Sequence, residues 1–164
     1  MTRSIRSPEE LQQASNHLFY EIWMFETLAQ TMALGIAGRG NVINNSLLEA
    51  FAIHVRALIG FFYSESPRKD DIIADDFFTS PNDWQKMRPQ KTELLDKAKK
   101  RADKEVAHLT YTRLDITPEQ KHWDFVKIYN DLQVLIKLFL NNIPRDLLGS
   151  KWEDFKQRRM GTQD

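Results

Sequence analysis

Arg101 and His108 are the pair of side chains in this 164-residue sequence whose types and spacing best suit chemistry. A guanidinium can clamp a phosphate group, and an imidazole can accept and donate a proton near neutral pH. Together they are the minimal equipment for cleaving RNA through its 2′-hydroxyl. On an α-helix, a separation of seven residues gives them one direction within about 20° and places them about 10 Å apart along the axis. We therefore expect both on an accessible flank, with a bound phosphodiester or a second subunit completing the site.

The segment around this pair is basic, although the whole chain is neutral with 23 Lys and Arg against 23 Asp and Glu. Residues 91 to 113 carry seven basic and four acidic side chains. The lysines that could attract an RNA backbone are Lys97, Lys99, Lys100 and Lys104. The alternative is a solvated basic helix face, with His108 near a C-terminal turn where the helix dipole favours cations.

An Arg followed by six residues and a His near the end of a helix resembles the signature of the HEPN superfamily, a group of small all-α bacterial and archaeal proteins. The residues that carry the resemblance are Arg101 and His108. The resemblance implies metal-independent RNA cleavage by this pair, usually assembled across a dimer interface, in toxin–antitoxin or phage-abortive systems. HEPN nucleases commonly place Asn, Asp or His directly after the Arg, where this chain has Ala102. A non-catalytic, binding member of such a family is therefore the alternative.

A second polar group lies on the most apolar predicted helix. Asn45, Glu49 and Arg56 fall within about 40° of one another, on the side opposite the richest apolar face. In a functional arrangement, Glu49 or Arg56 faces Arg101 and His108 across the bundle and builds one polar pocket with them. The alternatives are a solvent-facing stripe or a structural ion pair with a neighbouring helix. His54, at the apolar edge of this helix, is expected to be a hydrogen-bonded boundary histidine.

Several classes of site are not expected. The chain has no cysteine, which excludes disulfides and thiolate metal sites. Its four histidines form no His-x-x-x-His pair, so we predict no metal. The glycine-rich residues 35–40 lack the Lys-Ser/Thr ending of a phosphate-binding loop, so we expect no nucleotide and no cofactor. The acidic pairs at 70–71 and 75–76 resemble no calcium loop and suit solubility or loop capping.

Helical periodicity dominates the chain, and sustained two-residue alternation is missing. Ser7-Pro8-Glu9-Glu10 has the Ser, Pro and Glu of a capped helix start, and a seven-residue apolar repeat follows it. The expected helices span residues 8–36, 43–63, 93–112 and 118–141, with a short C-terminal helix at about 146–156. The sequence predicts an all-α, four-helix bundle-like single domain.

Residues 64–90 interrupt this pattern with acidic residues and three prolines. We expect a long, partly helical loop with short helical turns near 70–78 and 81–87, anchored on the bundle by its apolar side chains. Such a loop often forms a lid or a partner surface.

Two functions are consistent with these features. The first is a HEPN-like protein that binds or cleaves RNA without a metal. The second is a non-catalytic interaction module, in which the first helix and the aromatic segment from Phe77 to Trp84 dock a protein partner or a second copy. We expect a homodimer in both cases. The sequence shows no apolar signal segment and no run of about 18 apolar residues, so we expect a cytoplasmic protein without a membrane partner.

Overall fold

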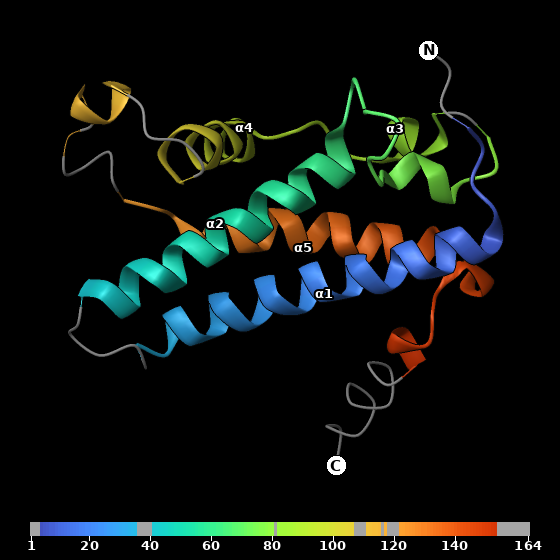
Figure 1. Ribbon diagram of the computed structural model, residues 1–164, viewed down its shortest axis with the longest axis horizontal. Coiled ribbons are helices and arrows are strands. Elements are labelled where there is room, and N and C mark those ends of the chain that lie inside the picture. Colours follow the sequence, from blue (N-terminus) through green and yellow to red (C-terminus); the bar gives the residue numbers. More distant parts are fainter. Residues whose placement is uncertain are drawn as a thin grey trace.

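The computed structural model describes residues 4–35, 41–80, 82–106, 111–115, 117 and 122–153. Over these ranges the chain is an all-α single domain without strands, as predicted. Four main helices pack together: α1 (Pro8–Ala33), α2 (Asn41–Tyr63), α4 (Glu93–Arg101) and α5 (Phe125–Asn142). Figure 1 shows α1, α2 and α5 running along the length of the molecule, with α4 packed at one end and the short α3 (Asp83–Met87) at the other.

Helix α1 begins at the predicted capping box. The Ser7 hydroxyl accepts from the Glu10 amide, and the Glu10 carboxylate accepts from the Ser7 amide at 2.8 Å. The helix ends at Ala33 and not at residue 36, because Gly35 takes a positive φ of 63° that terminates it. The predicted apolar row of α1 lies in the core, where Leu11, Leu18 and Phe25 are buried.

Helix α2 packs against α1, α4 and α5, as expected of the central helix. Phe51, Ala52, Val55, Leu58 and Ile59 are fully buried. By length and composition alone, residues Val42–Tyr63 could also cross a membrane, and 44% of the most apolar window is buried inside the domain. A buried core helix has the same composition, so this segment is weak grounds for either location.

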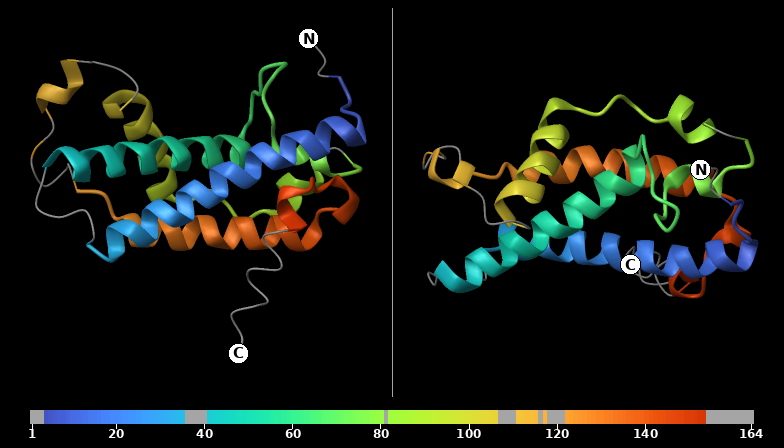
Figure 2. Two further views of the ribbon diagram at one scale, coloured as in Figure 1. Left: turned by 60° about the horizontal axis from the view of Figure 1, so that its bottom comes forward. Right: turned by 45° about the horizontal axis from the view of Figure 1, so that its top comes forward.

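The connection between α2 and α4 contains both predicted helical turns, as η1 (Ala74–Phe77) and α3. Figure 2 shows it leaving α2, packing η1 and α3 at the far end, and returning along the bundle to α4. Its apolar anchors enter the core as expected, with Phe77 and Trp84 buried, although Ile72 is 41% exposed. Phe77 and Trp84 are therefore not available at the surface, and docking of a partner by this segment stays a prediction.

The acidic pairs of this connection cap its turns, as one of the sequence interpretations proposed. The Asp71 carboxylate accepts from the Arg68 amide at 2.7 Å, and the Asp76 carboxylate accepts from the Ile73 amide at 3.3 Å.

The third predicted helix, residues 93–112, is not one continuous α-helix. Helix α4 ends at Arg101, and residues Ala102–Val106 form a π-helical turn, η2. A separate 3-10 turn, η3, spans Tyr111–Asp115. The burial of Leu95, Ala98 and Ala102 agrees with the predicted apolar line. Periodicity located this buried face, but it did not show that the hydrogen bonding widens after Arg101.

The fourth predicted helix, residues 118–141, starts later than expected. Residues 118–121 lie outside the described ranges, residues 122–124 are not helical, and α5 begins at Phe125. Asp124 caps it by accepting from the Lys127 amide at 3.2 Å. Trp123 is buried as predicted, but from the non-helical segment before α5.

The C-terminal helix expected at 146–156 is a 3-10 turn, η4 (Arg145–Leu147), followed by a helical turn at residues 151–153. Trp152 is buried and donates its indole N–H to the Ser15 carbonyl oxygen at 2.9 Å. Phe155, the other expected anchor, lies outside the described residues.

Gly149 fixes this terminal segment against α1. A Cβ at this position would lie 2.5 Å from the Asn16 side chain and 2.6 Å from the Gln12 carbonyl oxygen. Gly149→Ala is therefore expected to lower the free energy of unfolding by about 2 kcal/mol, because backbone of α1 cannot move aside cheaply. Urea denaturation followed by circular dichroism measures this change. Gly60→Ala, where the added Cβ meets nothing within 4 Å, is the control, and an equal effect of the two substitutions would contradict the prediction.

Candidate functional site

Arg101, at the last residue of α4, is held by three kinds of contact. Its Nε and Nη2 donate to the Glu105 carboxylate at 3.0 to 3.1 Å. Its Nη1 donates to the His122 carbonyl oxygen at 2.8 Å, and its guanidinium carbon lies 4.4 Å from the centre of the Trp123 ring. The side chain is 22% exposed. Arg101 thus ties the end of α4 to the segment before α5 and is less accessible than the sequence predicted.

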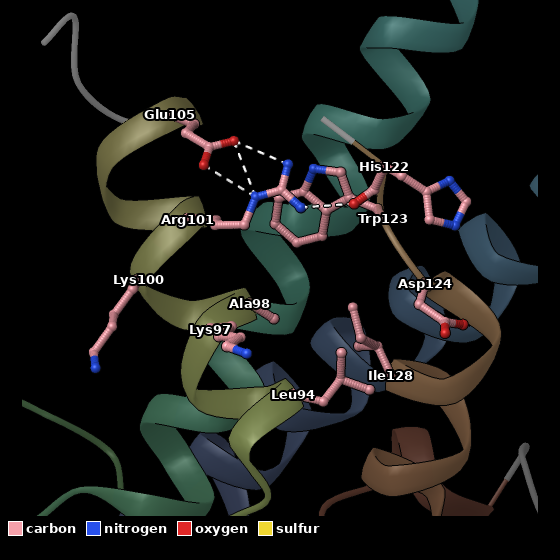
Figure 3. Close-up of a pocket in the computed structure, with 10 residues that line it drawn as sticks. All are labelled: Leu94, Lys97, Ala98, Lys100, Arg101, Glu105, His122, Trp123, Asp124 and Ile128. Atoms are coloured by element: carbon pink, nitrogen blue, oxygen red, sulfur yellow. Dashed lines mark hydrogen bonds and ion pairs between the residues drawn. The ribbon is translucent and has the colours of Figure 1, made fainter. Parts of the chain in front are cut away.

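Beside Arg101 lies a pocket of about 540 Å³ between α4 and the start of α5, here called the α4–α5 pocket. Its lining residues, labelled in Figure 3, are Leu94, Lys97, Ala98, Lys100, Arg101, Glu105, His122, Trp123, Asp124 and Ile128. Ala98, Trp123 and Ile128 are buried and give the pocket an apolar floor. Lys97, Lys100 and Arg101 add positive charge at its edge, and Glu105 and Asp124 add negative charge. An apolar floor with a few charged groups at its edge is typical of ligand sites.

The candidate lysines of α4 are ion-paired along the helix. Lys97 contacts Glu93 and Lys100 contacts Asp96, each at 2.6 Å. Both lysines line the α4–α5 pocket. Exposed ion pairs of this spacing contribute little stability and exchange partners readily, so a bound phosphate could take over these lysines.

Lys104 is exposed and is not part of the pocket lining.

His108 lies outside the described residues, so the structure does not test its pairing with Arg101. The expected common direction of the two side chains assumed continuous α-helical geometry. The π-helical turn at Ala102–Val106 takes more residues per turn, because its hydrogen bonds run from i to i+5. The angle between the Arg101 and His108 side chains expected for a continuous α-helix therefore does not apply across this turn.

Asn45, Glu49 and Arg56 do not join Arg101 in a single pocket. Asn45 and Glu49 are exposed on α2. Arg56 is exposed as well, and its Nε donates to the Asp103 carboxylate of η2. The stripe is therefore solvent-facing and makes one ion pair to the neighbouring helix, as the two structural alternatives proposed.

His54 is a hydrogen-bonded boundary histidine, as predicted. It is 8% exposed, and its Nδ1 lies 2.7 Å from the Glu21 carboxylate of α1. The edge of its ring meets Tyr20 at 5.8 Å between ring centres.

Glu105, His122 and Trp123 belong to the site but were not predicted as site residues. An Arg and a Glu four residues apart on a helix form a recognisable pair, and this spacing could have identified Glu105. No local pattern in the sequence predicts that Trp123 lies under Arg101, because the two residues belong to different segments of the chain. His122 contributes its carbonyl oxygen to Arg101, and Figure 3 shows its imidazole turned away from the guanidinium.

Within the described ranges, no group of three or more His, Asp or Glu side chains could hold a metal ion. The charged side chains that line the α4–α5 pocket are three cations and two carboxylates, and this small excess of positive charge suits an anion. Comparison of the chain with family models, curated proteins and solved structures finds no match.

Proposed function

We propose that this protein binds RNA in the α4–α5 pocket and cleaves the RNA backbone without a metal ion, with Arg101 and His108 as the residues of the reaction. The proposal depends mainly on one observation: Arg101, seven residues before His108 in the sequence, lines a pocket with an apolar floor and a cationic edge. The resemblance of the Arg101 and His108 spacing to the HEPN signature supports the same function.

The groups around the pocket suit the two parts of a nucleotide. A base can lie against the apolar floor formed by Ala98, Trp123 and Ile128, because every base has an apolar face. The phosphate on its 3′ side can then meet Lys97 and Lys100 at the edge. At Arg101 a phosphate would compete with Glu105, since both are anions that accept paired N–H bonds from a guanidinium.

The proposed reaction needs a base, an acid and a cation. The base removes the proton of a 2′-hydroxyl, whose oxygen then attacks the adjacent phosphorus and forms a 2′,3′-cyclic phosphate. The bond from phosphorus to the 5′ oxygen breaks, and that oxygen takes a proton to leave as a 5′-hydroxyl. The His108 imidazole would move these protons, and Arg101 would stabilise the charge that develops on the phosphate.

The test is cleavage of a mixed tRNA and mRNA pool in EDTA. His108→Ala is expected to lower the rate by about 100- to 10,000-fold, the usual contribution of general acid–base catalysis. Arg101→Lys keeps the charge but loses the paired geometry and is expected to lower the rate as well. Cleavage that persists in His108→Ala, purified in the same way, would overturn the catalytic proposal. So would a folded wild-type protein that cuts no RNA.

Arg88 provides a matched control for the contacts by which Arg101 stabilises the fold. Its guanidinium carbon lies 4.6 Å from the centre of the Tyr63 ring, and its Nη1 donates to the Phe62 carbonyl oxygen. Arg88→Ala therefore removes two of the three kinds of contact, the ring stacking and the bond to a backbone carbonyl, away from the pocket. If Arg88→Ala and Arg101→Ala lower cleavage equally, the effect of Arg101 is structural and its proposed catalytic part is wrong.

The second candidate function is a non-catalytic interaction module that pairs with another copy of itself. The observation that favours it is an exposed apolar group beside the α1–α2 contact: Tyr20 and Trp23 are each 45% exposed, and Ile53 is 53% exposed. Aromatic and aliphatic side chains of this kind are common at interfaces. Sedimentation velocity tests it: Trp23→Glu with Ile53→Glu is expected to convert a dimer into a folded monomer. A wild-type protein that stays monomeric at every concentration would exclude this function.

A further inference from the structure

A second depression, of about 700 Å³, borders α4 at a different point on its circumference from the α4–α5 pocket. It lies between the C-terminal half of α2, the connection that follows it, and α4; we call it the α2–α4 groove. Most of its surface is polar, and its basic lining residues are Arg56, Arg68, Lys91 and Lys99. By helical spacing, Lys99 points about 140° away from Leu94, which lines the α4–α5 pocket.

Along α4, two carboxylates share four cations. Asp96 contacts Lys91 at 2.9 Å through one oxygen and Lys100 at 2.6 Å through the other. Asp103 contacts Arg56 through one oxygen and Lys99 at 3.8 Å through the other. These side chains therefore carry more positive than negative charge.

The acidic groups of the groove lie on its other wall. Glu65 and Asp71 belong to the connection after α2, as does Arg68. The Asp71 carboxylate already accepts from the Arg68 amide. The excess of positive charge thus lies around Asp96 and Asp103, away from the connection. Hydrogen bonds from Lys100 and Lys91 hold the pKa of Asp96 down at about 2.

Asp96 joins the groove to the pocket. Lys100, one of its partners, lines the α4–α5 pocket, and Lys91, the other, lines the α2–α4 groove. Two ion-paired clusters thus lie from the pocket edge to the groove: Lys100 and Lys91 around Asp96, and Lys99 and Arg56 around Asp103. On a protein of zero net charge, two such clusters, each with two cations to one carboxylate, attract polyanions locally and not through the charge of the whole molecule.

We infer that the α2–α4 groove binds phosphate groups of the same RNA strand whose base occupies the α4–α5 pocket. This inference rests on the proposed function for its ligand. The strand would cross α4 near Asp96, with its phosphates successively meeting Lys100, Lys91 and Lys99. A basic groove that follows the backbone beside an aromatic surface is the usual arrangement for binding single-stranded nucleic acid.

The charge sharing allows a clean test. Lys91→Gln with Lys99→Gln removes two cations but leaves Asp96 paired with Lys100 and Asp103 paired with Arg56. The control pair, Lys86→Gln with Lys151→Gln, changes the net charge equally at exposed lysines that do not line the groove or the pocket. The probes are 2′-O-methyl oligouridylates of about four and about twelve nucleotides, which cannot be cleaved through a 2′-hydroxyl. Fluorescence anisotropy measures binding over a range of salt concentrations.

The wild-type protein is expected to bind the longer probe more tightly than the shorter one. In the Lys91 and Lys99 double variant, binding of the longer probe should weaken about tenfold, and its dependence of log K on log salt should become shallower by about 1.4. Binding of the shorter probe should stay unchanged, because it occupies the pocket alone. Lys97→Gln, at the pocket edge, should weaken both probes.

Other outcomes separate the two proposals. An unchanged salt dependence in the double variant, or an equal loss in the control pair, overturns the groove while leaving pocket binding intact. A loss of long-probe binding in the double variant with no effect of Lys97→Gln or Arg101→Lys supports the groove as a phosphate site and overturns the pocket. Failure of the wild-type protein to bind either probe overturns the inference, whatever the cleavage assay shows.

Discussion

Phe139→Ala is expected to lower the free energy of unfolding by about 3 to 5 kcal/mol. Phe139 is fully buried in α5 and meets five aromatic rings with centres 5.2 to 6.0 Å away. These rings belong to Phe61, Phe62, Phe77, Phe78 and Trp84. They come from α2, from α3 and from η1 with the residue after it, so Phe139 holds the long connection onto the bundle. Truncation would leave a cavity at this junction and remove several aromatic pairs at once.

Urea denaturation, followed by circular dichroism and by tryptophan fluorescence, measures this loss. Val134→Ala is the control, because Val134 lies on the same helix but is 56% exposed, and it should change the free energy of unfolding by less than about 0.5 kcal/mol. Similar losses in the two variants would show that the aromatic cluster is not the centre of stability.

Arg101→Ala is expected to lower the free energy of unfolding by about 3 kcal/mol. The variant loses a charged hydrogen bond to the His122 carbonyl oxygen, the paired bonds to Glu105 and the stacking on Trp123. The Glu105 side chain is 22% exposed and Trp123 is buried, so the loss should exceed that of an exposed ion pair. The Lys97 and Glu93 pair, on the same helix and exposed, provides the comparison.

A double-mutant cycle of Arg101→Ala and Glu105→Ala separates the ion pair from the other contacts. The coupling energy between the two residues should be about 1 kcal/mol, and the remainder of the Arg101 effect should persist in the Glu105→Ala background. Lys97→Ala should cost no more than about 0.5 kcal/mol. An Arg101→Ala variant as stable as Lys97→Ala would mean that Arg101 does not join α4 to the segment before α5. Its loss of cleavage could then be assigned to the reaction alone.

Local patterns in the sequence determined most of the helical framework. Ser7 and Glu10 cap α1 because their spacing matches the free amides of a first turn, wherever that helix packs. The apolar spacing of α5 predicted the burial of Leu132, Ile136 and Phe139, since a helix can hide apolar side chains only along a stripe set by its own geometry, although Val126 of the same predicted line is 54% exposed. The same reasoning predicted η1 and α3 in the connection and the hydrogen-bonded role of His54.

The sequence identified the site residues on α4 but not the residues of other elements that contact them. The sequence identified Lys97, Lys100 and Arg101, which line one pocket. It did not identify Trp123. It grouped Arg56 with Arg101, although Arg56, on α2, lines the α2–α4 groove and not the α4–α5 pocket. Neighbours across two helices depend on the rotation and height at which those helices pack, and periodicity along one chain segment contains neither quantity.

Tertiary structure also decided which aromatic residues are available for binding. Phe77 and Trp84 belong to an irregular segment, and their aromatic rings made them candidates for a docking surface. Both instead complete the core against Phe139. Tyr20 and Trp23, on the most regular helix, remain partly exposed. Tertiary structure also decided where α4 ends. The local pattern predicts that the α-helix continues after Arg101, but residues Ala102–Val106 form a π-helical turn. The sequence by itself determined which segments are helical and which faces are apolar, because both follow from local geometry. Packing between segments far apart in the chain decided which charges and rings meet.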